Sequence, residues 1–312
     1  MGEVTKKGTK ISILGAGNVG ASIAFTLAVA GTCSEIVLID IAKDKAKGEA
    51  MDIRQGTEFC SPVNIYDGEY EDCAGSDIVV VTLGRARKPG QTRLDLAQGN
   101  VDIIKSVMPQ VAKAAPDAVY VIVSNPVDIL TYAILKCTDL SPSQVIGSGT
   151  ALDTSRLCSF IADKTGVNTQ SVNAYVLGEH GDSSMVPWSI ANIGGVSISD
   201  LAPDTDLDQL AQDMRVAGAE VIKRKGATFY AIALSVNKIC DTVLRDQKTV
   251  LPVSTLINDK YGISDVCLSL PFIVGRKGIE GEVLPKLTDD EVAKLQASSD
   301  ALKEILSGLK FD

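Results

Sequence analysis

The chain of 312 residues is 45% hydrophobic and 22% charged, which excludes a disordered, collagen-like or coiled-coil protein and suggests two domains or one large one. Thirty basic residues against thirty-nine acidic ones give a net charge of −9, which argues against a nucleic-acid partner, since such proteins usually carry a basic face. The apolar runs are strand-sized and the first residues lack the apolar core of a signal peptide, so we expect a cytoplasmic protein that does not enter a membrane.

The first half of the chain alternates short β-branched runs with helical patterns, which predicts a parallel sheet covered by helices on both faces. Strands are expected at 10–15, 35–40, 63–66, 77–82 and 118–124, and helices at 18–30, 43–55 and 94–115. Right-handed crossovers then give an α/β domain with a doubly wound parallel sheet of the Rossmann type. The alternation fades after Gly147, so this domain is expected to comprise residues 1–147.

The second half is expected to form a mixed α+β domain, residues 148–312, with longer helices and shorter strands. Helices are predicted at 151–165, 207–225, 228–245 and 289–309, and β-type segments at 189–198 and 249–256. Gly166 and Gly226 end two of these helices. No Ser/Pro-rich linker separates the halves, so the boundary is predicted to be a packed junction.

A single histidine, His180, excludes any metal site within one chain that needs two imidazoles. The seven cysteines are odd in number and form no CxxC pair, so they are expected to be small buried side chains, and no metal site is predicted. The chemistry must therefore use carboxylates, arginines, hydroxyls and one imidazole, together with a bound cofactor.

Gly15, Gly17 and Gly20 fit the pattern GxGxxG between a predicted strand and a predicted helix. The first permits the tight turn, the second lets backbone approach a pyrophosphate, and the third lets helix and strand pack closely. Asp40 ends the next predicted strand, twenty residues beyond Gly20. Its carboxylate would hold the ribose hydroxyls and repel a 2′-phosphate, which predicts NAD; a structural turn with a chance acid is the alternative.

His180 stands in the glycine-flanked stretch GEHGD, typical of a loop-borne imidazole that serves as an acid–base near neutral pH. An ordinary hydrogen-bonded polar residue is the alternative. Asp153 and Arg156 are three residues apart on a predicted helix and share a face. Arg156 is a candidate for binding a substrate carboxylate and Asp153 for fixing the tautomer of His180, with an exposed ion pair as the alternative.

A basic stretch, residues 84–93, follows the predicted strand 77–82 and carries the cations Arg85, Arg87, Lys88 and Arg93. Its position between glycines at the carboxyl edge of the sheet is typical of a lid that closes over a small anion; a solvated loop is the alternative. Asn125 ends the strand 118–124 at the same edge and is expected near the nicotinamide, although Asn before Pro is also an ordinary turn signal.

These stretches together resemble the L-lactate and malate dehydrogenase family over almost the whole chain. The resemblance is carried by GAGNVG with Asp40, KPGQTRLDL, SNPVDILTY, IGSGTALDTSR, and GEHGDSS with Trp188-Ser189. It implies that His180, held by Asp153, takes or gives the hydroxyl proton and that Arg156 anchors the substrate carboxylate. Arg93 would polarise the carbonyl, and Asn125 would hydrogen-bond near the reacting oxygen.

The same resemblance implies that Thr228 lies on the substrate side and that Ile232 packs on the nicotinamide of NAD. The remaining implied cofactor contacts are Val19, Lys45, Tyr70, Gly84, Ser106, Val123, Asn125 and Ser148. The family also implies a homotetramer or homodimer.

The residues that bear on the choice of substrate point in opposite directions. Arg87 stands where lactate enzymes typically carry glutamine, and it favours oxaloacetate by pairing with a second carboxylate. Glu179, where malate enzymes tend to have glycine, the bulk of Thr228 and the charge of Asp182 oppose this. We predict an NAD-dependent L-lactate dehydrogenase that reduces pyruvate in glycolysis, with a malate dehydrogenase as the alternative. A non-enzymatic NAD-binding module, which has no use for His180 and the arginines, is the alternative from another class.

The resemblance also bears on regulation. Bacterial lactate enzymes activated by fructose 1,6-bisphosphate usually place an arginine two residues after the carboxylate-binding arginine and a histidine seven residues before the catalytic one. Those positions here are Cys158 and Asn173. Without the two cations the sugar phosphates would be uncompensated, so we predict no activation by that effector.

Overall fold

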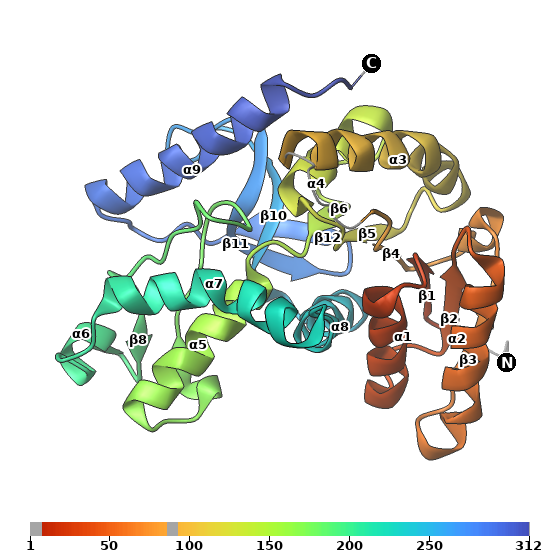
Figure 1. Cartoon of the computed structure of the whole chain (residues 1–312), viewed down its shortest axis with the longest axis horizontal. Coiled ribbons are helices and arrows are strands. Elements are labelled where there is room, and N and C mark those ends of the chain that lie inside the picture. Colours follow the sequence, from red (N-terminus) through yellow and green to blue (C-terminus); the bar gives the residue numbers. More distant parts are fainter. Residues whose placement is uncertain (1–7, 86–92, 312) are drawn as a thin grey trace, which may run out of the picture.

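The computed structural model describes residues 8–85 and 93–311, through which a nine-stranded sheet runs with helices packed on it (Figure 1). Its parallel part has the order β3-β2-β1-β4-β5-β6. These strands are β1 (Lys10–Leu14), β2 (Glu35–Ile39), β3 (Asn64–Asp67), β4 (Ile78–Val81), β5 (Val119–Ile122) and β6 (Val145–Gly147). The order reverses between β1 and β4, and ligands bind doubly wound sheets at such a switch point. The predicted doubly wound sheet is confirmed.

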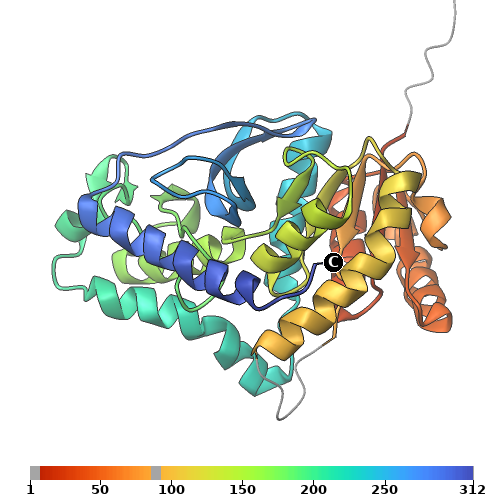
Figure 2. The ribbon, with the colours of Figure 1, turned by 90° about the horizontal axis from the view of Figure 1, so that it is seen from above.

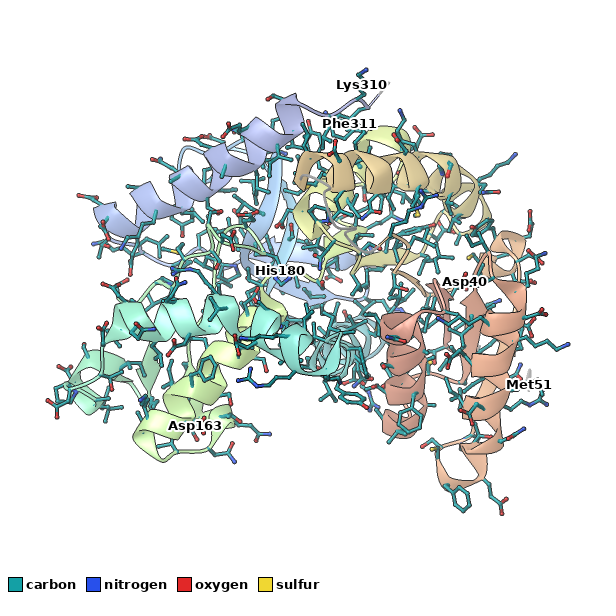
Figure 3. All side chains as sticks on the ribbon, in the orientation of Figure 1. Asp40, Met51, Asp163, His180, Lys310 and Phe311 are labelled. Atoms are coloured by element: carbon teal, nitrogen blue, oxygen red, sulfur yellow. The ribbon has the colours of Figure 1, made fainter. Side chains whose placement is uncertain are left out.

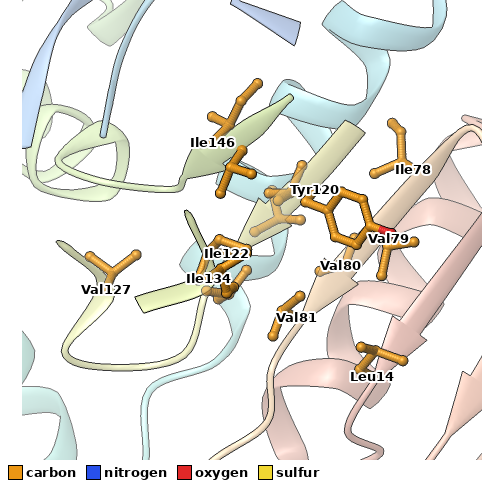
Figure 4. Close-up of a cluster of buried hydrophobic side chains, with 14 of the residues drawn as sticks. Leu14, Ile78, Val79, Val80, Val81, Tyr120, Ile122, Val127, Ile134 and Ile146 are labelled. Carbon is orange, nitrogen blue, oxygen red and sulfur yellow. The ribbon is translucent and has the colours of Figure 1, made fainter. Parts of the chain in front are cut away.

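The central strands are buried on both faces, as their uninterrupted β-branched sequences predict. Every residue of β4 and β5 is buried, and together with neighbouring side chains they form the core drawn in Figure 4. Tyr120 is fully buried in it, and its single hydroxyl proton is shared between the carbonyls of Val111 (3.2 Å) and Ala115 (2.9 Å). The phenol is thereby satisfied inside an apolar environment.

The helices of the first half are α1 (Asn18–Ala30), α2 (Lys43–Gln55), α3 (Arg93–Ala114) and α4 (Val127–Cys137), with 3-10 turns at Thr57–Phe59 and Tyr70–Cys73. The first three agree with the helices predicted from the sequence, whereas α4 was not predicted. Gly31 ends α1 at a φ of 62°, in the left-handed region that favours glycine.

The sheet continues into the second half of the chain. Strand β10 (Thr249–Ile257) pairs antiparallel with β6 through Ser254 and Gly147, and β11 (Val266–Gly275) and β12 (Gly278–Glu282) extend it. The predicted segment 189–198 forms only the short strands β8 (Asn192–Ile193) and β9 (Val196–Ser197), which pair with β7 (Val172–Asn173) in a second, three-stranded sheet.

The remaining helices are α5 (Ala151–Thr165), α6 (Ile198–Leu201), α7 (Leu207–Lys225), α8 (Tyr230–Leu244) and α9 (Asp289–Ser307), with a 3-10 turn at Thr169–Ser171. Figures 1 and 2 show α1 and α2 at one end of the molecule and α5 to α7, with the small sheet, at the other. A search of the described helices found none with the length and hydropathy needed to cross a membrane.

Candidate active site

The turn between β1 and α1 has the geometry of a phosphate-binding turn. Gly15 adopts a φ of 101°, and a Cβ on Gly20 would lie 1.9 Å from the carbonyl oxygen of Gly15, so both positions require glycine. A Cβ on Gly17 would meet nothing within 4 Å, which leaves the outer side of the turn open. No side chain caps the N-terminus of α1, so its first N–H groups can bind an anion there.

Asp40 fixes the other side of this site. Its carboxylate accepts hydrogen bonds from the backbone N–H groups of Ala16 (2.7 Å) and Ala42 (2.9 Å), which hold it beside the glycine turn. Its remaining lone pairs can accept ribose hydroxyls, and its charge disfavours a 2′-phosphate. Tyr70 lies nearby: burial raises the pKa of its phenol, and the charge of Asp40 adds to the shift. These residues fit NAD.

The other predicted cofactor residues are spread over several elements. Val123 and Ser148 directly follow β5 and β6, and their backbone N–H groups continue the sheet by bonding Val81 (2.9 Å) and Ile122 (2.7 Å). Val19, on α1, and Ile232, on α8, pack against the main core, Gly84 follows β4 with a φ of 151°, and Lys45 is exposed on α2. The exposed Ser106 donates its hydroxyl to Ile103 within α3, so its role at the cofactor stays a prediction.

The predicted catalytic residues of the second half meet in one hydrogen-bonded set. Asp153, in the first turn of α5, has one carboxylate oxygen 2.5 Å from Nδ1 of His180, and its other oxygen accepts a hydrogen bond from Nη1 of Arg156 at 2.9 Å. The side chain of Asp153 is 8% exposed, whereas that of His180 is 23% exposed. Because Nδ1 faces the carboxylate, Nε2 is the ring nitrogen left for a substrate. Figure 3 places His180 in the middle of the molecule.

The charges in this set shift both pKa values. Burial alone would raise the pKa of Asp153, but the facing His180 and Arg156 outweigh it and hold that pKa below its ordinary value. Burial alone would lower the pKa of His180, but the carboxylate of Asp153 outweighs it and holds that pKa above its ordinary value. The imidazole therefore keeps its proton at higher pH than a free histidine does.

These shifts predict a pH-dependent stability. The raised pKa of His180 stabilises the fold fully below its unfolded pKa of about 6.5, and this contribution is lost as the pH rises through the folded pKa. The lowered pKa of Asp153 contributes above about pH 4 and is lost in acid. Urea unfolding should therefore show His180→Gln most destabilised near pH 5.5, with a smaller difference at pH 9. An equal difference at both values would contradict the ion pair.

Consecutive backbone amides hold the His180 loop from three sides. The N–H of Gly178 donates to the carbonyl of Ser269 on β11 (3.0 Å), and that of Glu179 to Oγ of Ser298 on α9 (2.9 Å). The N–H of His180 donates to Oδ2 of Asp128 on α4 at 2.8 Å. With Asp153 on the ring, four elements fix the imidazole, so its geometry is set by the fold before any ligand binds.

A cavity of about 290 Å³ opens on the imidazole. Its lining comprises Leu96, Ala97, Asn125, Pro126, Glu179, His180, Gly181, Asp182 and Ile305. Asn125 is tied to the end of β4, because the buried Asn100 accepts from the backbone N–H of Arg85 (2.9 Å) and donates to the carbonyl of Asn125 (2.8 Å). Asn125 and His180 thus line the same cavity, and the role of Asn125 at the reacting oxygen stays a prediction.

Other predicted substrate residues lie apart or outside the described part. Thr228 stands between α7 and α8, and within the described residues no hydrogen bond or ion pair joins it to His180. Arg87 lies outside the described residues, as does the side chain of Arg93, whose backbone begins α3. In the described ranges, no group of His, Cys, Asp and Glu is arranged to hold a metal ion.

Three further residues at the site, Asn100, Asp128 and Gly218, were not predicted from the sequence. Asn100 and Asp128 are polar residues at buried helix positions among apolar ones, which is the signal that could have found them. Gly218, in the middle of α7, makes room for the guanidinium of Arg156, because a Cβ there would lie 3.1 Å from Nη2. A glycine inside an amphipathic helix is its signal.

Comparisons with known proteins cover both halves of the chain. The family model described as lactate/malate dehydrogenase, NAD binding domain, matches residues 9–147, and the model of the alpha/beta C-terminal domain of lactate/malate dehydrogenase matches residues 150–311. An L-lactate dehydrogenase of Clostridium botulinum (strain Hall) is 47% identical over 306 residues, 96% of each chain. L-lactate dehydrogenase 1 of Clostridium acetobutylicum is 44% identical over 311 residues, 97% of this chain and 99% of that one.

Two solved structures that match this chain are also named lactate dehydrogenases. The crystal structure of the minor L-lactate dehydrogenase from Enterococcus mundtii in the ligands-bound form matches with a TM-score of 0.94 and 38% identity, over 97% of this chain and 99% of that one. MGS-M5, a lactate dehydrogenase enzyme from a Medee basin deep-sea metagenome library, matches with a TM-score of 0.93 and 37% identity, over 96% and 98% of the two chains.

Proposed function

The chain belongs to the lactate/malate dehydrogenase family, and from this premise we propose that it is an NAD-dependent L-lactate dehydrogenase that reduces pyruvate to L-lactate. The observation that supports this best is the contact of His180 Nδ1 with Asp153 at 2.5 Å, with Arg156 on the same carboxylate. A proton carrier and a cation for a carboxylate are the two groups that a 2-oxo acid requires. The relatives named L-lactate dehydrogenase support the choice of substrate.

In the proposed mechanism Arg156 binds the carboxylate of pyruvate through its guanidinium fork and fixes the orientation of the carbonyl. His180 holds a proton at Nε2 and delivers it to the carbonyl oxygen as that oxygen gains negative charge. Asp153 keeps the ring in the required tautomer and stabilises the imidazolium before transfer. Arg93 is proposed to polarise the carbonyl from the stretch 84–93, and Asn125 to hydrogen-bond near the same oxygen.

NAD fits the turn formed by Gly15, Gly17 and Gly20, and when bound in its reduced form it supplies the hydride. In the proposal the N-terminus of α1 binds the pyrophosphate and Asp40 binds the ribose hydroxyls. The direction of the reaction then decides which form of His180 is active: protonated for pyruvate reduction and neutral for lactate oxidation.

The acidic lining of the cavity favours pyruvate over oxaloacetate. Glu179 lines it beside His180, so a second substrate carboxylate would face like charge. NADH oxidation measured with each substrate in turn tests the proposed function. We expect kcat/KM to be at least about tenfold higher for pyruvate, since like charges across a site cost several kcal/mol. The reverse preference would favour a malate dehydrogenase that uses Arg87, and turnover of neither would favour an NAD-binding module.

The remaining assignments are proposals of the same kind. We divide the chain into an NAD-binding domain, residues 1–147, and a substrate domain, residues 148–312, which is supported by family matches that end at 147 and begin at 150. A glycolytic role follows from the substrate. A cytoplasmic location is supported by the free state of all the cysteines, because disulfides are rare in that compartment.

A homo-oligomer, either a tetramer or a dimer, is supported by an exposed apolar face on α1 and α8. Phe25 is 58% exposed, Tyr230 68% and Leu234 63%, and the three line a hollow of about 430 Å³. Met51, on the neighbouring α2, is also half exposed (Figure 3). Monomers rarely expose contiguous apolar patches of this kind, so we propose that a second copy covers it.

Leu234→Asp should therefore shift the protein toward smaller species in sedimentation velocity at micromolar concentration, because a buried charge at an apolar interface weakens association by about 100-fold or more. Leu201→Asp is the matched control: Leu201 is 44% exposed on α6, away from this face, and should leave the mass unchanged. If both variants keep the mass of the wild type, the face on α1 and α8 is not the interface.

Fructose 1,6-bisphosphate should not activate the enzyme. Cys158 and Asn173, at the two positions that carry cations in activated relatives, come close together: the thiol of Cys158 lies 3.9 Å from the carbonyl of Val172, next to Asn173. A thiol and a carboxamide carry no positive charge at any pH, so neither group can neutralise a phosphate. Pyruvate saturation curves with and without the effector should superimpose. A fall in KM of more than about twofold, outside the error of such curves, would show another phosphate site.

A further inference from the structure

Asp128 is a buried carboxylate behind the His180 loop that the proposed mechanism does not use. It is 2% exposed in the first turn of α4, three residues after Asn125. One carboxylate oxygen accepts the backbone N–H of His180 at 2.8 Å, and the other accepts the hydroxyl of Ser254, on β10, at 2.6 Å. The carboxylate thus joins α4, β10 and the loop that carries the imidazole.

Hydrogen bonding alone does not explain a carboxylate at this place. A buried N–H and a buried hydroxyl could be satisfied by an asparagine of the same shape, whereas a buried charge carries a large desolvation cost. Accordingly, burial raises the pKa of Asp128 to about 6, although the bonds from Ser254 and His180 oppose the rise. The carboxylate is therefore ionised above that pH, including the neutral range in which an imidazole exchanges its proton.

We propose that Asp128 is a second positioning carboxylate for His180: it holds the backbone of the imidazole loop and places a negative charge behind the ring that stabilises the imidazolium. This inference rests on the proposed function, because it assigns Asp128 to the acid–base role of His180. Asp153 fixes the ring from the side of α5, and Asp128 fixes the loop from the side of α4.

The charged groups that face His180 come from three segments. Asp153 raises its pKa most, Asp128 raises it further, and Arg156, also on α5, opposes them. Glu179, in the same loop, raises the pKa of Asp128. Glu179 and Asp182 also line the cavity beside the imidazole. Removing the charge of Asp128 takes away one of the two carboxylates that raise the pKa of His180 while the opposing guanidinium remains, so this pKa should fall.

Asp128→Asn is the decisive variant, because its amide can still accept from the His180 N–H and donate to the Ser254 hydroxyl. Lower basicity has opposite consequences in the two directions. The alkaline limb of pyruvate reduction should move to lower pH, with a loss of about three- to tenfold in kcat/KM on that limb, since one pKa unit is tenfold. The acid limb of lactate oxidation should also move to lower pH, so the variant should oxidise lactate faster than the wild type in acid.

The pKa of the imidazole can be measured directly, because His180 is the only histidine in the sequence. In the full-length protein labelled at histidine, NMR titration should give a lower imidazole pKa in Asp128→Asn than in the wild type. This readout requires no turnover, so it separates the two questions. A wild type that does not turn over pyruvate overturns the proposed function, whereas an unchanged imidazole pKa overturns the role of Asp128.

Thr131→Ala is the matched control. Thr131 is fully buried one turn further along α4, and its hydroxyl bonds the carbonyl of Val127 within the helix. It should lower stability without moving either pH limb. If Asp128→Asn lowers kcat equally at every pH, as a purely structural change does, the proposal is wrong.

If Asp128→Asn does not fold, the variant Ser254→Ala tests the role of Asp128 instead. It removes the hydroxyl that holds the carboxylate ionised, so the pKa of Asp128 rises further and less charge stands behind the ring near pH 7. The imidazole pKa should then fall in the same direction as in Asp128→Asn. An unchanged value in Ser254→Ala contradicts the proposal.

Discussion

His180→Gln is expected to lower kcat for pyruvate reduction by about 10²–10⁴-fold while leaving the affinity for NADH unchanged. Glutamine can fill the place of the ring, but it cannot give up a proton near neutral pH, and no other imidazole exists in the chain. The glycine turn and Asp40 belong to separate elements, so cofactor binding does not depend on His180. Turnover is followed by NADH absorbance, and binding by NADH fluorescence.

Chemical modification of the wild type gives an independent control for this result. The His180 side chain is 23% exposed, so a carbethoxylating reagent can reach it. Loss of activity should follow the modification of one histidine per chain, and pyruvate with NADH should protect against it. A His180→Gln variant that keeps more than about a tenth of the wild-type kcat, above the range expected for removal of a general acid, would show that the proton comes from elsewhere.

Asp153→Asn should have the next largest effect, with kcat/KM for pyruvate lowered by up to about 10⁴-fold, the loss seen when the carboxylate behind a catalytic imidazole becomes an amide. The amide can hold Nδ1 in the wrong tautomer and no longer stabilises the imidazolium. It also frees Arg156 from its partner, so KM for pyruvate should rise together with the fall in kcat. The alkaline limb of the pH profile should move to lower pH, because the group that raises the pKa of His180 is gone.

Asp163→Asn is the matched control on the same helix. Asp163 is exposed near the opposite end of α5, well away from His180 in Figure 3. The same chemical change there should leave kcat, KM and the pH profile as in the wild type. Equal losses in both variants would mean that α5 as a whole, and not the carboxylate on the imidazole, is responsible.

Most of the parallel sheet could be predicted because its strands and helices have clear periods, whereas α4 and β11 were among the elements that could not be, for identifiable reasons. The residues of α4 from 127 to 134 are all buried, so the helix has no polar face whose 3.6-residue period could be read. Strand β11 contains Pro271, which argues against a central strand, but in the structure it stands opposite Pro252 of β10.

The contacts of the candidate site likewise fall into those that the sequence could predict and those that it could not. The glycine turn and Asp40 are close in sequence and could be predicted from spacing alone. The contact between Asp153 and His180 joins residues 27 apart on different elements, so the residues alone offered it as a candidate beside an exposed ion pair, and the family resemblance then implied it. The contact of Asp128 with the His180 amide depends on how α4 and the loop pack, which no local pattern encodes.

The pairing of β6 with β10 limits how the chain can be divided. A fragment that ends at residue 147 would lose Ser254, the partner of Gly147, and would present Val145 and Ile146, both fully buried in the whole chain, at an open strand edge. Open apolar edges recruit strands from other molecules. The NAD-binding half made alone should therefore aggregate, and a chimera that exchanges halves with a relative should fold only if it preserves the close packing of residues 147 and 254 across the join.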